Sequence, residues 1–538
     1  MSLPFRAPLA ALLAAVLCAA PLAAQPAADS ARATHVLRTI GGAGEELWRL
    51  DQLTGRADGA GYLLRSPSSA TPRGASGITV LVPELESAWN SHIPFSLNDG
   101  ALWAGRGASG RAMAGVVATA GAVRMILAPE VVASQNAAFD SLLPATWTAE
   151  DRADYIPPWE WGPHSIDLPW RYGGGQVRTV LPGQSSLSVY AGPVVAGAAT
   201  ESQWWGPGLR NGILFSNNAA GFPHLFLRTA RPLRTPLGRL EAKWLLGGLS
   251  ASGYTTPEDD GDGRRSLSAL GLTLQPGAGF TVGIARGVYS PVEEWGQVAG
   301  RAVDVLGQWD AGRDSTGRAA EQMTSLTARW ISPGDGAELY VEWARRELPA
   351  SFREVLLQPE HSQGYTLGGQ LARPLRAGTL RLQAEHTTLE KSSTFRDRPI
   401  GSWYASRRIP EGYTQRGQVI GAAIGPGASG QWLAGDYVAG RGQLGGFLGR
   451  VRWANDAYYD KPDGHNRYRA HDVSIFTGVR GGIDVAGARV GVEYTLMRRW
   501  NYLFQNYSQD WETRDRSVNP INHTLRLQLS ASPRLLRR

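Results

Sequence analysis

Cysteine is almost absent from this chain, since Cys18 is the only one among 538 residues. It lies in an N-terminal stretch laid out like a secretory signal peptide. Arg6 precedes an apolar run from Leu9 to Ala20, and small residues follow up to Ala24. We therefore assign residues 1–24 to a signal peptide. Its removal would leave a mature chain without cysteine, which excludes disulfides and thiolate metal sites.

Long apolar runs are lacking after the signal peptide as well. No later segment approaches the roughly 18 apolar residues that a membrane-spanning helix requires. The chain is nevertheless longer than the about 250–300 residues at which a single soluble core usually splits into domains. No linker divides it. An ordinary soluble domain and a helical membrane protein are therefore both poor descriptions of this sequence.

Charge is scarce and only mildly unbalanced. Charged residues make up 19% of the chain, and the formal net charge is +7. Attraction to an acidic polysaccharide or to lipopolysaccharide phosphates would use such an excess. A small surplus of Arg over so long a chain can equally have no function. Because the exported chain carries no basic cluster, we do not expect nucleic acid as a partner.

Glycine and aromatic residues are abundant by contrast. The chain has 66 Gly, 19 Trp and 17 Tyr, which suits many strands, tight turns and rings at a membrane interface. From about residue 98 onward, apolar and polar residues alternate. Leu339, Val341 and Trp343 share one face of a strand, and Glu338 and Glu342 share the other. The same alternation recurs in residues 239–244, 380–385, 490–494 and 525–530.

This alternation predicts the fold class. A soluble sandwich must cover its apolar faces with a second layer, and the sequence offers none. A lipid-facing exterior around a wet lumen satisfies the pattern. We predict an all-β protein, a transmembrane antiparallel β-barrel of about 18 strands formed by residues 98–538, in the outer membrane of a Gram-negative-type bacterium. Such a barrel contacts outer-membrane lipid and lipopolysaccharide, and we expect a monomer.

Residues 25–97 read differently and predict a short helical periplasmic segment. Apolar residues between Glu45 and Leu53 recur at helical spacing. Residues from Pro83 to Asn90 would form a second short helix, with the proline in its first turn. Residues 138–175 are rich in Pro and Trp and predict an elaborate loop.

Counting strands back from the C-terminus assigns the connections to the two ends of the barrel. Short periplasmic turns and long outer loops are the usual asymmetry of such barrels. The predicted periplasmic turns are 333–336, 375–378 and 484–487. The predicted outer loops are 347–363, 387–400, 455–470 and 500–520.

The most distinctive motif is Gln-Trp-Trp-Gly-Pro-Gly at residues 203–208. Ile-Leu-Phe-Ser-Asn-Asn-Ala follows at 213–219, and segments at 165–173 and 183–189 precede it in a fixed order. This ordered set resembles the Wzi family, outer-membrane β-barrels that bind capsular polysaccharide at the bacterial surface. The resemblance implies a protein that binds capsular or exported polysaccharide and helps to assemble or retain it there.

Two other classes of function are possible alternatives for such a chain. A passive outer-membrane pore or uptake channel would use the same barrel, with lumen residues setting its selectivity. An enzyme would need a nucleophile–base pair or a metal cluster. The nine His residues are scattered, and no pair has the spacing of a helical zinc site. We therefore predict no enzymatic activity, no catalytic residues, no metal and no cofactor.

Candidate ligand-binding residues follow from carbohydrate chemistry. Aromatic rings pack on sugar C–H faces, while Asn, Asp and Arg side chains bond hydroxyls and carboxylates. Trp204 and Trp205 offer rings, unless they belong to an aromatic girdle at the membrane interface. Asn217 and Asn218 either recognise hydroxyls or build a turn. The late outer loops supply the other candidates, which are Tyr458, Tyr459, Asp460, Tyr502, Tyr507, Asp510, Trp511 and Arg514.

Overall fold

The computed structural model describes most of the chain. The described residues are 34–139, 175–252, 263–307, 319–349, 351–406, 408–459, 468, 470–506 and 517–537. The predicted signal peptide, the segment at 165–173 and nearly all of the predicted loop at 138–175 lie outside them.

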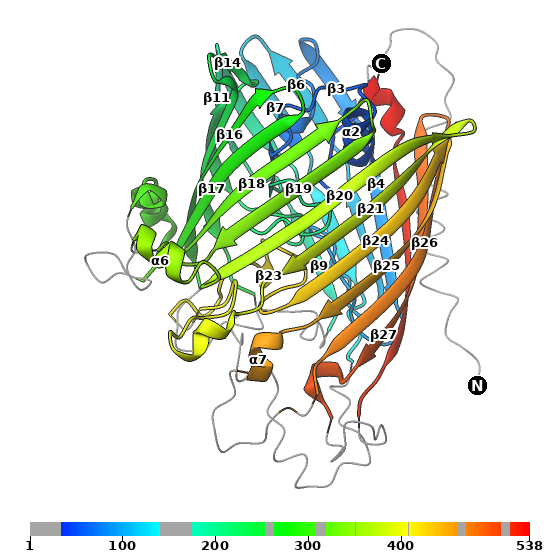
Figure 1. Ribbon diagram of the computed structural model, residues 1–538. Coiled ribbons are helices and arrows are strands. Elements are labelled where there is room, and N and C mark those ends of the chain that lie inside the picture. Colours follow the sequence, from blue (N-terminus) through cyan, green and yellow to red (C-terminus); the bar gives the residue numbers. More distant parts are fainter. Residues whose placement is uncertain are drawn as a thin grey trace, which may run out of the picture.

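The second half of the chain forms one continuous antiparallel wall (Figure 1). Each strand pairs with the next along the chain. The strands are β15 (Gly238–Leu249), β16 (Arg265–Gly277), β17 (Phe280–Pro291), β18 (Glu321–Ser332), β19 (Ala337–Arg345), β20 (Gln363–Leu375), β21 (Gly378–Thr388), β24 (Ser429–Ala439), β25 (Gly442–Arg452), β26 (Val473–Val485), β27 (Ala488–Trp500) and β28 (Ile521–Ala531).

The first part of the wall is made of interrupted strands. Two short strands that follow each other along the chain cross the wall once as a couple, and the strands of one couple pair with the strands of the next. The couples are β3 (Gly77–Leu81) with β4 (Glu84–Asn90), β5 (Gly107–Met113) with β6 (Val116–Ala120), β7 (Val123–Leu127) with β8 (Glu130–Ser134), and β9 (Val177–Leu181) with β10 (Ser186–Ala191). Then come β11 (Val194–Ala199) and β13 (His224–Thr229), which β14 (Leu233–Thr235) extends.

The last strand closes the wall on the first. β28 pairs antiparallel with β4, with Leu525 opposite Trp89 and Leu529 opposite Leu85. With each couple counted once, the described residues make a closed ring of 18 strands. Closure pairs the first and last strands of the wall, which would otherwise be the two open edges of the sheet. The predicted antiparallel β-barrel of about 18 strands is confirmed.

Apolar and polar residues of the wall face opposite sides, as the alternation predicted. Leu339 of β19 is 60% exposed on the outer face, whereas Glu338 and Glu342 are buried toward the lumen. The short turns at 333–336, 376–377, 440–441 and 486–487 lie at one end of the barrel. The loops that carry α6 (Phe352–Leu357) and α7 (Asn455–Tyr459) lie at the opposite end (Figure 1). The predicted division into short turns and long loops is therefore confirmed.

The N-terminal segment confirms one expected helix and corrects the other. α2 (Ala43–Leu53) is helical, and its Leu50 and Leu53 pack against Ile331 and Ala372 of the wall. The helix predicted at Pro83–Asn90 is wrong, because these residues form β4. Their backbone hydrogen-bonding groups pair with β28, which is distant along the chain. The spacing of nearby residues cannot reveal such a partner. The wall thus begins at β3, ahead of the boundary predicted at residue 98.

The lumen is filled near its middle. Residues 91–106, 200–223 and 408–428 turn inward, and we call these three segments the plug. Their apolar side chains form one buried cluster with inward-facing residues of the wall such as Leu245 and Leu267. Within the described residues, no helix is long and apolar enough to cross a membrane.

Small elements brace the interior and the loops. β12 (Trp204–Trp205) pairs with β2 (Leu64–Arg65), β22 (Thr414–Gln415) pairs with β23 (Gln418–Val419), and β1 (Thr34–His35) runs parallel to β3. The remaining short helices are α3 (Pro67–Ala70), η3 (Trp295–Arg301), η4 (Asp304–Leu306), η5 (Ser393–Arg396), η6 (Tyr502–Phe504) and η7 (Pro533–Arg537).

Candidate functional site

The Trp-Trp motif lies inside the barrel. β12 is paired with β2 on an inner segment of the chain, so neither ring belongs to an aromatic girdle at the membrane interface. Trp205 is 1% exposed, and its ring centre lies 4.7 Å from that of Phe215 in the apolar cluster of the plug. Its faces are closed to a sugar in this structure, which favours an architectural role. Trp204 borders a cavity instead.

The glycines of the motif allow a close approach to the wall. Gly206 has a φ of +102°, and its N–H donates to the carbonyl of Leu63 at 2.8 Å. A Cβ at Gly206 would lie 2.9 Å from Oε2 of Glu342, whose carboxylate also accepts the N–H of Ile213 at 3.2 Å. Glycine tolerates this backbone conformation and leaves the space that the carboxylate needs. The motif therefore fixes the plug to β19.

Asn217 and Asn218 build the plug backbone. The side-chain amide of Asn218 donates to the carbonyl of Val419 at 2.9 Å, and its Oδ1 accepts the N–H of Asn98 at 3.4 Å. The backbone carbonyl of Asn217 accepts the N–H of Gly100 at 2.7 Å. These bonds join the three plug segments, so the structure favours the turn-building alternative over hydroxyl recognition.

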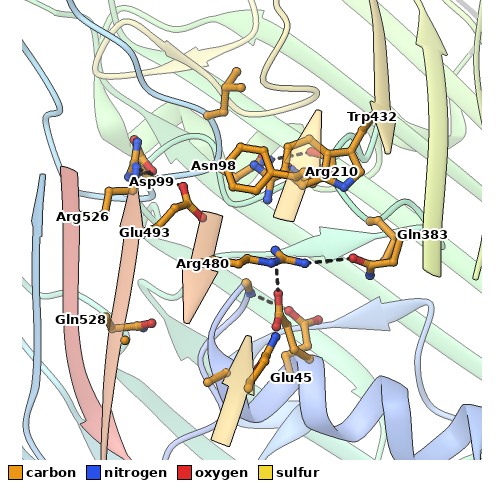
Figure 2. Close-up of a pocket in the computed structure, with 18 of the residues that line it drawn as sticks. Glu45, Asn98, Asp99, Arg210, Gln383, Trp432, Arg480, Glu493, Arg526 and Gln528 are labelled. Atoms are coloured by element: carbon orange, nitrogen blue, oxygen red, sulfur yellow. Dashed lines mark hydrogen bonds and ion pairs between the residues drawn. The ribbon is translucent and has the colours of Figure 1, made fainter. Parts of the chain in front are cut away.

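A cavity of about 250 Å³ lies between α2 and the plug (Figure 2). Its lining comes from α2, from β2 and the residues just before it, from the plug, and from wall strands between β21 and β28 together with β4. The charged residues that line it are Glu45, Glu46, Arg49, Arg65, Glu86, Asp99, Arg210, Arg381, Arg480, Arg489, Glu493 and Arg526. Trp204, Trp432, Phe447 and Phe476 supply its aromatic surface. Sugar-binding sites combine the same two kinds of side chain.

Ion pairs fix α2 in the lumen. Nη2 of Arg49 lies 2.6 Å from Oε1 of Glu338 and donates to the carbonyl of Pro207 at 2.7 Å. Nε of Arg329 donates to the same carboxylate at 2.7 Å. Glu338 is therefore shared by the helix and the wall, and Arg49 also contacts the Trp-Trp motif. Removing one partner of such a buried pair leaves an uncompensated charge.

The other arginines around the cavity are paired as well. Arg381 and Arg480 both bind Asp436, at 2.9 and 2.8 Å. Arg526 binds Asp99 at 2.5 Å. Arg65 pairs with Glu45, and Arg489 pairs with Asp484. Longer contacts join Glu46 to Arg381 and Arg480 at 3.5 and 3.9 Å, and Glu493 to Arg526 at 3.9 Å.

Arg210 is the exception, because no described carboxylate lies at ion-pair distance from its guanidinium. The N–H groups of Leu209, Arg210 and Asn211 donate to the carboxylate of Glu385 at 2.5 to 3.1 Å, which fixes the backbone. The guanidinium carbon lies 4.5 Å from the centre of the Trp432 ring, a cation–π contact. Burial lowers the pKa of Arg210.

A second cavity of about 620 Å³ lies at the turn end of the barrel. It shares Ala43, Glu46, Arg381, Gln443 and Arg489 with the first cavity, so the two adjoin around α2. Its other arginines are Arg56, Arg373, Arg376, Arg441 and Arg534. A mouth lined in this way attracts anions toward the lumen.

The outer-loop candidates are only partly described. Tyr459 is 49% exposed, and the ring of Tyr458 packs 4.0 Å from that of His471, measured between centres. Tyr502 is 1% exposed within the apolar cluster, so its ring is closed to ligand here. Asp460, Tyr507, Asp510, Trp511 and Arg514 lie outside the described residues. The loops thus leave Tyr459 and part of Tyr458 accessible.

Sequence reasoning missed the lumen cavity. Arg210 stands close to the Trp-Trp motif, but Trp432 is far from it along the chain, and only barrel closure and the fold of the plug bring them together. The described residues hold no group of three or more His, Cys, Asp or Glu side chains arranged for a metal ion.

Comparison with known proteins shows a family to which the chain is similar. The family model of the capsule assembly protein Wzi matches residues 183–435, which include the Trp-Trp motif, much of the plug and the wall from β10 to the middle of β24. The chain is therefore similar to the Wzi family over just under half of its length. The sequence resemblance is thereby confirmed. A search of curated protein sequences finds no match.

One solved structure supports the fold. Wzi of Escherichia coli, described as an outer-membrane protein involved in group 1 capsule assembly and as a carbohydrate-binding β-barrel, superposes with a TM-score of 0.54 at 10% identity over 84% of each chain. OccAB3 of Acinetobacter baumannii and OpdK of Pseudomonas aeruginosa bound to vanillate give TM-scores of 0.37 and 0.39 at 8% and 11% identity. They cover 84% of this chain and 98% and 97% of theirs.

Proposed function

We propose that this outer-membrane β-barrel binds capsular or exported polysaccharide and helps to assemble or retain it at the cell surface. The observation that carries the proposal is the match of the Wzi family model to residues 183–435. Support comes from the Escherichia coli Wzi barrel, which is described as carbohydrate-binding. The polar and aromatic lining of the lumen and the partly exposed Tyr459 suit such a ligand.

The binding is non-covalent in this proposal. Many weak contacts from outer-loop aromatics and polar side chains would hold the polymer, each ring contact contributing about 0.5–1.5 kcal/mol. Asp460, Tyr507, Asp510, Trp511 and Arg514 remain proposed contacts of these loops. The protein acts as a monomer and leaves its polysaccharide chemically unchanged.

The exposed wall provides the membrane partners. Leu339, Leu367, Leu433 and Leu527 present 43 to 60% of their surface outward in the manner of a lipid-facing belt. Outer-membrane lipid and lipopolysaccharide are the proposed neighbours of this belt. The alternative of a passive channel requires an open lumen, and the buried apolar cluster of the plug opposes it.

The proposal is tested with the full chain in detergent, immobilised for surface plasmon resonance. An acidic capsular polysaccharide and neutral dextran are passed over the surface, and the polysaccharide is then analysed for chain length. We expect saturable binding of the acidic polymer that weakens in high salt, with no change in chain length. No binding beyond that of dextran would refute the polysaccharide-binding function, and shortened chains would refute the non-enzymatic one.

A further inference from the structure

Among the described residues, the guanidinium of Arg210 is held in the lumen cavity with no carboxylate at ion-pair distance. The backbone of Arg210 is fixed by Glu385 and by the side-chain amide of Asn98, which donates to the Arg210 carbonyl at 2.6 Å. One face of its guanidinium packs on Trp432, whose ring is backed in turn by Phe447 with 4.7 Å between centres. The cation is therefore positioned before any ligand arrives. Preorganised groups of this kind bind with less loss of conformational entropy.

The surroundings of Arg210 favour a ligand that carries both a carboxylate and hydroxyls. Glu493 and Gln528 project into the same cavity from β27 and β28 (Figure 2). A guanidinium fork matches a planar carboxylate, whereas the Glu493 carboxylate accepts hydroxyl donors and repels a small multivalent anion. At about 250 Å³, the cavity is smaller than the ~300–1,000 Å³ typical of drug-sized ligands, which suits about one sugar ring.

Among the described residues, the cavity adjoins a wider space on the turn side. On the loop side it meets the plug, where a neighbouring cavity lined by Arg210, Trp432 and Ile424 holds only about 20 Å³, room for roughly one water. On the turn side it adjoins the arginine-lined mouth around α2. An acidic sugar would thus approach from the periplasmic end of the predicted topology.

We propose that Arg210 binds the carboxylate of one uronic-acid-type sugar in a lumen subsite that is reached past α2 and is separate from the outer loops. The inference rests on the proposed function for its ligand class. It deepens that function by giving the protein a second contact with acidic polysaccharide, on the side from which exported material would come.

The test is isothermal titration calorimetry of the full chain in detergent with glucuronate, glucose and inorganic phosphate. We expect glucuronate to bind and glucose to bind at least about tenfold more weakly. Arg210→Gln should weaken glucuronate binding at least about tenfold, because the fork is lost. Arg178→Gln, the same substitution at an exposed arginine of β9, should leave it unchanged.

A second variant distinguishes loss of the Arg210 contact from misfolding of the first variant. Gln528→Trp fills the cavity from the wall and keeps Arg210, and it should abolish glucuronate binding. Both variants should keep the gel shift between folded and boiled protein. Three results would each overturn the subsite. They are an unchanged glucuronate affinity in Arg210→Gln, phosphate binding as tight as glucuronate binding, and no glucuronate binding at tens of millimolar. If polymer binding fails while glucuronate binding persists, the proposed function fails and the subsite stands.

Discussion

Individual residues divide into those that build the plug and those that offer a surface to ligand. Trp205 and Tyr459 illustrate the two roles, since one is 1% exposed and the other 49% exposed. Trp205→Ala should destabilise the barrel by about 3–5 kcal/mol, as large buried aromatics do when truncated. Tyr459→Ala should leave stability unchanged and weaken polysaccharide binding by about 1 kcal/mol. Urea titration of the gel-shifted form and surface plasmon resonance measure the two effects. If Trp205→Ala instead weakened binding and Tyr459→Ala instead lowered stability, the two assigned roles would be wrong.

Gly206 gives a sharper test of the motif at the same scale. Gly206→Ala places a methyl group 2.9 Å from Glu342 and forces a non-glycine residue to a φ of +102°. We expect a loss of about 1–3 kcal/mol in the free energy of unfolding, measured by urea titration. Gly296→Ala is the matched control, because its Cβ would meet no atom within 4 Å. Equal stability of the two variants would contradict the account of the motif.

Among the elements, α2 depends on its ion pair with β19. Glu338→Gln leaves Arg49 and Arg329 without their carboxylate in a buried setting. We expect a cost of about 3–5 kcal/mol and faster proteolysis of the N-terminal segment. Glu293→Gln, at an exposed glutamate, controls for the loss of charge. If α2 resists protease equally in both variants, the ion pair does not hold the helix.

The contact between α7 and the loop after it is sensitive to pH. Burial and the nearby Arg452 lower the pKa of His471, whose ring packs on Tyr458. Arg450 also disfavours the protonated ring, whereas Glu390 favours it. Because the folded form prefers neutral imidazole, this contact is fully stable above the ordinary pKa of about 6.5 and weakens as the pH falls below it.

Hydrogen exchange of residues 455–459 measures this effect. Exchange corrected for its intrinsic pH dependence should rise between about pH 6.5 and 5, and His471→Gln should remove the change. A contact that strengthens over the same interval would reverse the sign and contradict the assignment.

At the scale of the whole molecule, the sequence predicted the barrel well. Alternation along strands such as β19 is a local property set by lipid outside and polar groups inside, and it was enough for the strand number and the two ends. Residues of β4 were predicted to be helical because their hydrogen-bonding partner, β28, lies at the other end of the chain. The same long-range closure hid the pairing of Arg210 with Trp432. Candidate ligand residues chosen by chemistry alone included Trp205 and Tyr502, whose burial depends on how the plug and loops pack.

The central claim is that this barrel holds polysaccharide at the cell surface. The direct measurement is the ratio of cell-bound to released polysaccharide in encapsulated cells that lack the protein and are then supplied with it on a plasmid. We expect loss of the protein to shift polymer into the medium without changing the total made, and the wild-type chain to restore it to the cells. An unchanged ratio in cells without the protein would contradict the account.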